Sequence, residues 1–177
     1  MTIGRITRIA LLASLAVLLS AFLANSGSHP AAKAQPQFGS GNNCMHVGGS
    51  IITNFGAVDA NTTLGPATGD LRGAVAATLL TPPQQTTLPD GRTAVLFNVQ
   101  HHWVTESGDN IYFDRAVATT LPLSATRFAV LSYPAHITGG TGKFAGATGN
   151  LTNIGEADLQ AGTVFRYSGE VCFGDTQ

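Results

Sequence analysis

A glycine-rich segment from His136 to Leu151 constrains the fold of this chain more than any other feature. Its five glycines are Gly139, Gly140, Gly142, Gly146 and Gly149. Strand-like sequence precedes the segment, from Arg127 to Ile137, and follows it up to about Ala157. Because glycine reaches positive φ and lets backbones approach closely, the segment is typical of a tight turn with bends in the flanking strands. It therefore favours a β-rich fold.

The same segment partly matches two nucleotide-binding motifs. A P-loop would need a glycine at Ile137 and a serine or threonine at Phe144, and both residues differ. The dinucleotide pattern G-x-G-x-x-G/A fits Gly140, Gly142 and Ala145, but it needs a following helix whose N-terminus binds the pyrophosphate. The glycines and asparagines downstream disfavour that helix. The sequence thus predicts no nucleotide site.

Strand-like runs recur after residue 44 and are separated by turn signals. The predicted strands are 45–53, 70–80, 93–106, 111–120, 127–137, 144–158 and 163–173. The run 144–158 is long enough for two strands broken at Gly149–Asn150, which gives seven or eight in all. Residues 54–68 and 81–92 are predicted as loops, and Ser107–Asn110 as a hairpin turn. Short strands at regular spacing indicate a sandwich or barrel, and closure, which removes exposed edges, favours a barrel.

Residues 1–34 are predicted to be a secretory signal peptide. Arg5 and Arg8 supply a positive start, Ile9–Leu23 is apolar, and Ala32–Ala34 is an A-x-A cleavage site. An uncleaved membrane anchor is the alternative. Because the apolar run of about 15 residues is shorter than the roughly 20 that a membrane span needs, cleavage is favoured.

The mature chain is then expected to begin at Gln35 and to be secreted or otherwise extracytoplasmic. Residues 35–43 form a short flexible lead, and 44–177 a single β-barrel domain. Six basic and ten acidic residues remain, for a net charge near −4. Since phosphate binding needs a basic patch, this balance argues against nucleic acid and anionic membrane surfaces as partners.

Two cysteines, Cys44 and Cys172, lie near the two ends of the mature domain. In an oxidising compartment such a pair normally forms a disulfide. It would tie the first strand to the last, which a closed barrel places side by side, and would stabilise the domain by about 4–5 kcal/mol in the chain-entropy model. The alternative is metal ligation by the cysteines with His46, which lacks a C-x-x-C or second Cys-His cluster. The sequence predicts neither a metal site nor a cofactor.

Period-2 alternation assigns side chains to the two faces of each strand. In the longest strand one face holds Val95, Phe97, Val99, His101 and Trp103. In the next strand one face holds Ile111, Phe113, Arg115 and Val117. In the last strand Phe165, Tyr167, Val171 and Phe173 oppose Val164, Arg166, Ser168, Glu170 and Cys172.

A small barrel either fills its interior or holds one ligand. The candidate ligand-binding residues are Phe97, Val99, His101, Trp103 and Arg115, and the candidate catalytic residues are His101 and Glu170. His101 beside Trp103 indicates a hydrogen-bonding group or general base next to an aromatic wall. The alternative is a core histidine packed beside a tryptophan. No G-x-S-x-G elbow and no H-E-x-x-H motif accompany them.

The segment Gly139–Gly149 resembles the Gly-Gly-Thr-Gly-x-Phe segment of plant dirigent proteins and of bacterial proteins with an allene oxide cyclase-like barrel. The ending Tyr167–Cys172 is similar to the last strand of the bacterial group. The resemblance covers residues 42–174. It implies an eight-stranded antiparallel barrel, often trimeric, that binds small hydrophobic molecules or guides their cyclisation or coupling.

Three functions remain open at this point. The first is a secreted barrel that binds a small hydrophobic molecule. The second is a cofactor-free isomerase or cyclase of the allene oxide cyclase type, or a dirigent-like coupling guide. The third is a non-catalytic structural or interaction module of the cell exterior, with a filled barrel.

Overall fold

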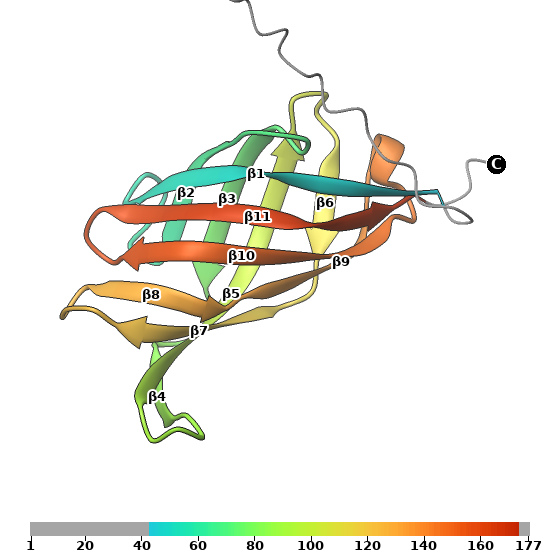
Figure 1. Ribbon diagram of the computed structural model, residues 1–177. Helices are drawn as coiled ribbons and strands as arrows, with labels where there is room; N and C mark the ends of the chain where they lie inside the picture. The colour runs from blue at the N-terminus through green and yellow to red at the C-terminus, as the bar shows by residue number, and fades with distance from the viewer. Residues whose placement is uncertain (1–42, 174–177) are drawn as a thin grey trace, which may run out of the picture. The chain divides into compact units, whose positions relative to one another are not determined.

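The computed structural model describes residues 43–173, where eleven strands form one sheet (Figure 1). They are β1 (Cys44–Phe55), β2 (Thr62–Ala67), β3 (Gly73–Leu79), β4 (Gln84–Thr87), β5 (Thr93–Thr105), β6 (Asn110–Phe113), β7 (Ala116–Pro122), β8 (Arg127–Ser132), β9 (Pro134–Gly140), β10 (Thr148–Asp158) and β11 (Gly162–Cys172), with one 3-10 turn, η1 (Gly142–Phe144). The predicted signal peptide and nearly all of the predicted lead lie outside the described residues. Within residues 43–173 no helix has the length and apolarity to cross a bilayer.

The sheet closes on itself as an antiparallel barrel with eight strand positions, which confirms the predicted fold class. Strands β6 and β7 share one position, and β8 and β9 share another, because each pair is one strand interrupted by a short irregularity. The ring runs β1, β2, β3, β5, β6/β7, β8/β9, β10 and β11. It closes where β11 pairs with β1, from Cys44 opposite Cys172 to Thr53 opposite Thr163.

Strand β2 lies within the predicted loop 54–68, and this prediction was wrong. The sequence Thr62–Ala67 contains Gly65 and Pro66, which are turn signals in most contexts. Here Gly65 is required by close packing, because a Cβ at this position would collide with the carbonyl oxygen of Ile52 on β1. The glycine therefore marks the close approach of two strands rather than a loop.

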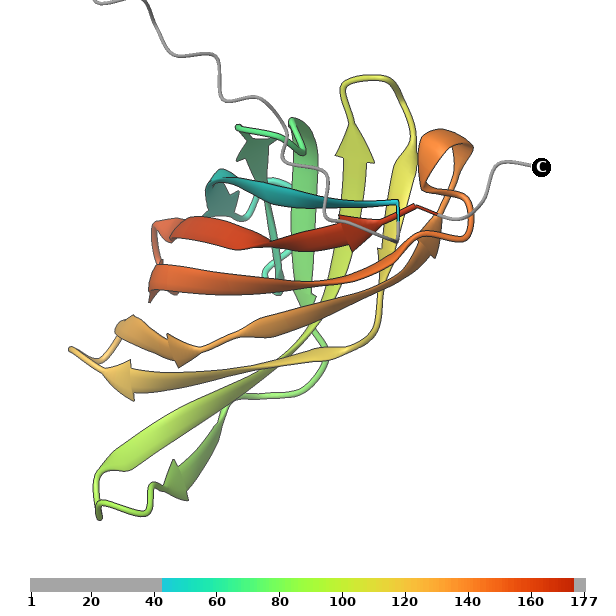
Figure 2. The same cartoon turned by 45° about the vertical axis from the view of Figure 1, so that its right-hand side comes forward.

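Strand β4 is a second strand within a predicted loop, 81–92. It pairs with the first residues of β5, from Gln84 opposite Leu96 to Thr87 opposite Thr93. Because β5 extends beyond its contact with β3, the β4–β5 hairpin projects from one end of the barrel (Figure 2).

The glycine-rich segment is a tight turn, as predicted, but its details differ. Residues 142–144 form η1 instead of beginning a strand, and β10 is continuous, so the predicted break at Gly149–Asn150 is wrong. Gly142 has φ of 53° and lies against the carboxylate of Asp109, where a side chain would collide. The turn buries Phe144 completely, and this side chain fills the interior at the end of the barrel where the turn lies.

A bulge between β6 and β7 overturns the predicted orientation of Arg115 and Val117. Ile111 pairs with Trp103, whereas Ala116 pairs with Val99, so one extra residue lies on the β6/β7 side. Such an insertion moves every later side chain to the opposite face. Arg115 and Val117 are accordingly exposed, while Ala116 points inward.

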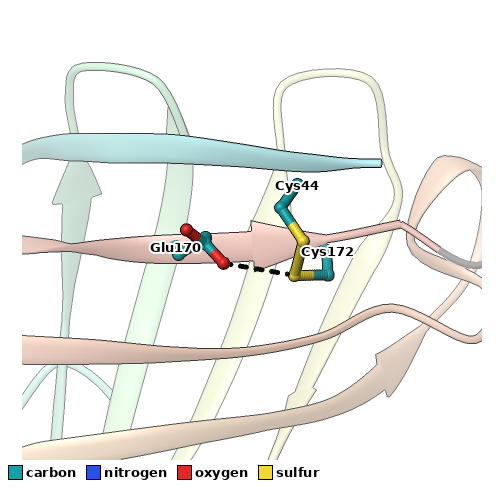
Figure 3. A group of neighbouring side chains, drawn as sticks. All are labelled: Cys44, Glu170 and Cys172. Carbon is teal, nitrogen blue, oxygen red and sulfur yellow. Dashed lines mark hydrogen bonds between the residues drawn. A yellow bond between two sulfur atoms is a disulfide. The ribbon is translucent and has the colours of Figure 1, made fainter. Parts of the chain in front are cut away.

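Cys44 and Cys172 form a disulfide with an S–S distance of 2.06 Å (Figure 3), as the sequence predicts. It joins the first residue of β1 to the last residue of β11. We call the half of the barrel at this end the closed half, and the half from which the β4–β5 hairpin projects the hollow half.

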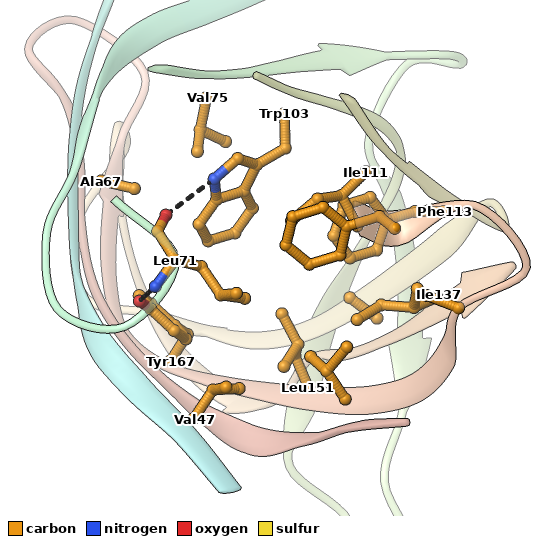
Figure 4. Close-up of a cluster of buried hydrophobic side chains, with 14 of the residues drawn as sticks. Val47, Ala67, Leu71, Val75, Trp103, Ile111, Phe113, Ile137, Leu151 and Tyr167 are labelled. Atoms are coloured by element: carbon orange, nitrogen blue, oxygen red, sulfur yellow. Dashed lines mark hydrogen bonds between the residues drawn. The ribbon is translucent and has the colours of Figure 1, made fainter. Parts of the chain in front are cut away.

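The closed half is filled by a dense core (Figure 4). Leu71, from the loop between β2 and β3, lies at its centre, where its carbonyl accepts a hydrogen bond from Trp103 Nε1 at 2.9 Å and its amide donates to the Tyr167 hydroxyl at 2.9 Å. The Trp103 ring stacks on Phe113 with ring centres 6.0 Å apart and meets Tyr167 edge-on at 5.3 Å. These contacts pair the polar atoms of both large aromatic side chains, as burial requires.

Candidate ligand cavity

A cavity occupies the hollow half and runs from the middle of the barrel to the strand ends. Its wall is mainly apolar, and it includes Phe55, Leu79 and Leu159, which lie at or just beyond the ends of β1, β3 and β10. The apolar wall residues include Ile51, Val75, Phe97, Val99, Ala118, Val130 and Phe165. The space open to the centre of a water molecule is about 60 Å³. A single water needs roughly 10–15 Å³ by this measure, so the cavity can admit a slender organic group.

Several threonines line the cavity, but their hydroxyl groups already have partners. Thr53 and Thr163 hydrogen-bond to each other at 2.7 Å between their Oγ1 atoms, and Thr120 Oγ1 donates to the carbonyl of Val95 at 2.9 Å. A hydroxyl bonded within the protein has less capacity for a ligand. These residues therefore contribute little polarity to the site.

His101 and Tyr133 form the main polar feature of the wall. His101 Nε2 and the Tyr133 hydroxyl are 2.7 Å apart, and the two rings pack with centres separated by 5.4 Å. His101 is half-buried as a residue, but its Nδ1 is inaccessible and has no hydrogen-bond partner within residues 43–173. A buried polar atom without a protein partner is unusual in a folded protein.

An irregularity between β8 and β9 directs Tyr133 into the barrel. Glu156 pairs with Ala129, whereas Gly149 pairs with Ile137, so this side of the ladder contains one extra residue. Asn153 fixes the resulting bend, because its backbone amide and its Nδ2 both donate to the Tyr133 carbonyl, at 3.0 and 3.2 Å. Bulges of this kind reorient side chains next to functional sites.

Burial keeps both members of this pair neutral. It lowers the pKa of His101 from 6.5 to about 4, with a smaller contribution from the neighbouring His102. It raises the pKa of the Tyr133 hydroxyl above its ordinary value of 10. At neutral pH the imidazole thus has one N–H donor and one nitrogen acceptor, and the phenol keeps its proton.

The pair can hydrogen-bond in two ways. Either the Tyr133 hydroxyl donates to Nε2 and His101 carries its proton on Nδ1, or Nε2–H donates to the Tyr133 oxygen and the phenol proton is free for another acceptor. In both arrangements one donor is left over. The pair is therefore suited to hydrogen-bonding an oxygen or nitrogen acceptor.

The structure brings together some of the predicted site residues and separates others. Phe97, Val99 and His101 line the cavity. Trp103 is 3% exposed within the core of the closed half, and Arg115 is exposed on the outer surface. Glu170, on the outer wall, lies beside the disulfide and 3.8 Å from His46. The two candidate catalytic residues, His101 and Glu170, thus belong to different regions.

Tyr133 and Asn153 are cavity residues that sequence reasoning missed. Alternation counted from Phe128 would place Tyr133 on the outer face, because the extra residue is not visible in the pattern. The available signal was Pro134, since the residue before a proline is restricted in conformation and often marks an irregularity.

Comparison with models of protein families, with curated proteins and with solved structures found no match to this chain.

Proposed function

We propose that this protein binds a small, largely apolar molecule in the hollow half of its barrel, with a polar atom of the ligand meeting the His101–Tyr133 pair. The observation that carries this proposal is an apolar cavity whose wall contains one buried hydrogen-bonding pair, His101 and Tyr133. Ligand pockets combine apolar walls with a few convergent polar groups in this way.

The shifted pKa values of His101 and Tyr133 favour ligand binding over proton transfer. A general base works best when its pKa lies near the operating pH, and that of His101 is about 4. The raised pKa of Tyr133 makes it a weak general acid. A cofactor-free cyclase, isomerase or coupling guide remains the second candidate, supported by the resemblance of Gly139–Gly149 to allene oxide cyclase-like and dirigent proteins.

We infer that the protein acts outside the cytoplasm. The signal-like residues 1–34 and the Cys44–Cys172 disulfide support this inference, because disulfides form and persist in oxidising compartments.

The outer wall supports self-association, with a trimer as the arrangement that the resemblance implies. Ile52 faces Val164 across the β1–β11 pair and Ile154 lies on β10, and these side chains are 53%, 60% and 55% exposed. Adjacent exposed apolar residues often mark interaction sites. In sedimentation velocity, Ile52→Lys should shift the protein towards monomer, whereas Val104→Lys, on β5, should not. A monomeric wild-type protein at micromolar concentration would contradict this proposal.

An environment-sensitive apolar dye tests the binding proposal. The dye should bind the wild-type protein with increased emission and be displaced by apolar molecules that carry one hydrogen-bond acceptor. His101→Ala should weaken the binding of such acceptors by about 1–3 kcal/mol, since their polar atom then lacks its partner. His102→Ala, an exposed change on the adjacent position, is the matched control and should have no effect. Equal binding by the two variants would refute the assigned role of His101.

A further inference from the structure

Four side chains with metal-binding atoms lie together on the outer wall of the closed half. Cys44 and His46 belong to β1, and Glu170 and Cys172 to β11. Cys44 pairs with Cys172 and His46 pairs with Glu170, so the four residues form one patch on two adjacent strands. Residues two apart in a strand point to the same face. All four therefore project outward from the barrel, and Figure 3 shows three of them.

The donor atoms of three of these residues are already close in the disulfide-bonded form. The sulfur and carboxylate atoms of Cys44, Cys172 and Glu170 lie within 4.8 Å of one another, with Cys172 Sγ 3.4 Å from Glu170 Oε1. His46 lies outside this group of three, and its Nδ1 is 3.8 Å from Glu170 Oε2. The His46 and Glu170 side chains are 68% and 46% exposed, so an ion can reach them from solvent.

We propose that reduction of the Cys44–Cys172 disulfide converts this cluster into a Zn²⁺ site with two thiolates, one imidazole and one carboxylate as ligands. Tetrahedral coordination by cysteine, histidine and acidic residues is the arrangement that zinc adopts in proteins. Two sulfurs bound to zinc at about 2.3 Å lie roughly 3.8 Å apart. Breaking the S–S bond allows that separation. The strand pairing keeps His46 and Glu170 on the same face, and a rotation of the exposed His46 side chain would complete the site.

Disulfide and metal exclude each other, because the thiolates that would bind zinc are used in the S–S bond. A phosphine reductant gives two electrons to this bond and becomes a phosphine oxide, with water supplying the oxygen and the two protons of the thiols. A dithiol supplies the same electrons and protons and becomes a cyclic disulfide. Zinc then displaces the two thiol protons. The site is independent of the ligand cavity, which lies in the other half of the barrel.

Metal binding by the full chain tests this proposal. The protein is reduced with a phosphine, freed of reductant without oxygen, and titrated with Zn²⁺ against a chromophoric chelator. One Zn²⁺ should bind per reduced chain, and none with comparable affinity to the oxidised chain. Co²⁺ in place of Zn²⁺ should give the thiolate charge-transfer and tetrahedral ligand-field absorption bands. Zinc should also raise the melting temperature of the reduced chain, because it binds the folded form.

Two pairs of variants, all with both cysteines intact, distinguish a four-ligand site from zinc binding by the thiols alone. His46→Ala and Glu170→Gln should each weaken Zn²⁺ binding by at least about tenfold. His102→Ala and Glu106→Gln, exposed residues elsewhere on the barrel, should leave it unchanged. Failure of the reduced wild-type chain to bind Zn²⁺, or equal affinity in all four variants, would overturn the proposal. If the reduced chain loses its β-sheet circular dichroism signal, Zn²⁺ should restore that signal. A signal that Zn²⁺ does not restore would also overturn the proposal.

Discussion

The two halves of this barrel use the same strands in opposite ways. Along β10, Leu151 packs in the closed half at 1% exposure, whereas Ala157 lines the cavity at the other end. Along β11, Tyr167 and Val171 fill the closed half, whereas Thr163 reaches the cavity. The ladder of hydrogen bonds is continuous through both halves. The change from filled core to cavity therefore occurs without a change in strand pairing.

Removing the disulfide should have the largest effect on stability. Cys44 and Cys172 are 128 residues apart in sequence, so their bond restricts a very long loop of the unfolded chain. Replacing both by serine should lower the free energy of unfolding by about 4–5 kcal/mol in the chain-entropy model. Urea denaturation would measure this loss. Amide exchange should show lost protection first at the closed ends of β1 and β11. If protection against amide exchange is lost first in the hollow half, the inference that the disulfide stabilises the closed half is wrong.

Acid should act on the hollow half through His101. The unfolded chain binds a proton at this residue near pH 6.5, whereas the native pKa is about 4. Between these values the unfolded state holds more protons, so stability falls as the pH decreases, by up to about 3 kcal/mol. The measurement is the difference in urea unfolding between pH 7 and 4.5.

His101→Phe should remove this part of the pH dependence, while His102→Ala should retain it. The comparison with wild type separates the histidine from the carboxylates, which also titrate in acid. If the unfolding free energies of wild type and His101→Phe change equally with pH, the native histidine is not held neutral.

A pair of valine variants compares the packing of the two halves directly. Val171 in the closed half is 0% exposed, and Val99 at the cavity wall is 5% exposed. Val171→Ala should cost about 2 kcal/mol, because it removes packed atoms and leaves a void. Val99→Ala should cost about 1 kcal/mol, since its side chain already lacks neighbours on one side. Equal costs in chemical denaturation would indicate that the two halves are packed alike.

Two Ala→Leu variants should show the smallest difference in stability between the two halves. Ala118→Leu places a larger side chain at the cavity wall and should change stability little while it weakens binding of the apolar dye. Ala135→Leu, in the packed core, should destabilise the domain by at least about 1 kcal/mol through overpacking. Thermal unfolding and dye titration of both proteins would test this contrast. Unchanged dye binding by Ala118→Leu would place the bound dye outside the cavity.

Much of the fold could be predicted because local pattern and tertiary structure agree. Alternation in the longest strand correctly placed Val95, Phe97, Val99 and Trp103 on one face, and the structure shows that this face points inward. The hairpin turn at Ser107–Asn110 is also confirmed, with the Gly108 amide donating to the Thr105 carbonyl at 2.9 Å. The end positions of the two cysteines predicted their bond.

The errors have a different physical origin, because they depend on contacts between strands. Gly65 resembles a loop residue in sequence but is required where β2 crosses close to Ile52. One extra residue lies near Arg115 and another near Tyr133. Each changes which of the following side chains point into the barrel, and neither can be recognised in the hydrophobic pattern. The His101–Tyr133 pair depends on the second of these irregularities. Pro134 signals an irregularity at that position, but the contact joins residues 32 apart in sequence and is seen only in the structure.

The disulfide also determines how the barrel would respond to a pulling force. Strands β1 and β11 are antiparallel neighbours, and Cys44 and Cys172 form the outermost pair of residues between them. Tension applied to the two ends of the domain would otherwise peel these strands apart one residue pair at a time, which is the weakest way to load a sheet. With the covalent bond in place, the load passes from one end to the other through the two sulfur atoms. The oxidised barrel should therefore stay folded under a tension that unzips the reduced one.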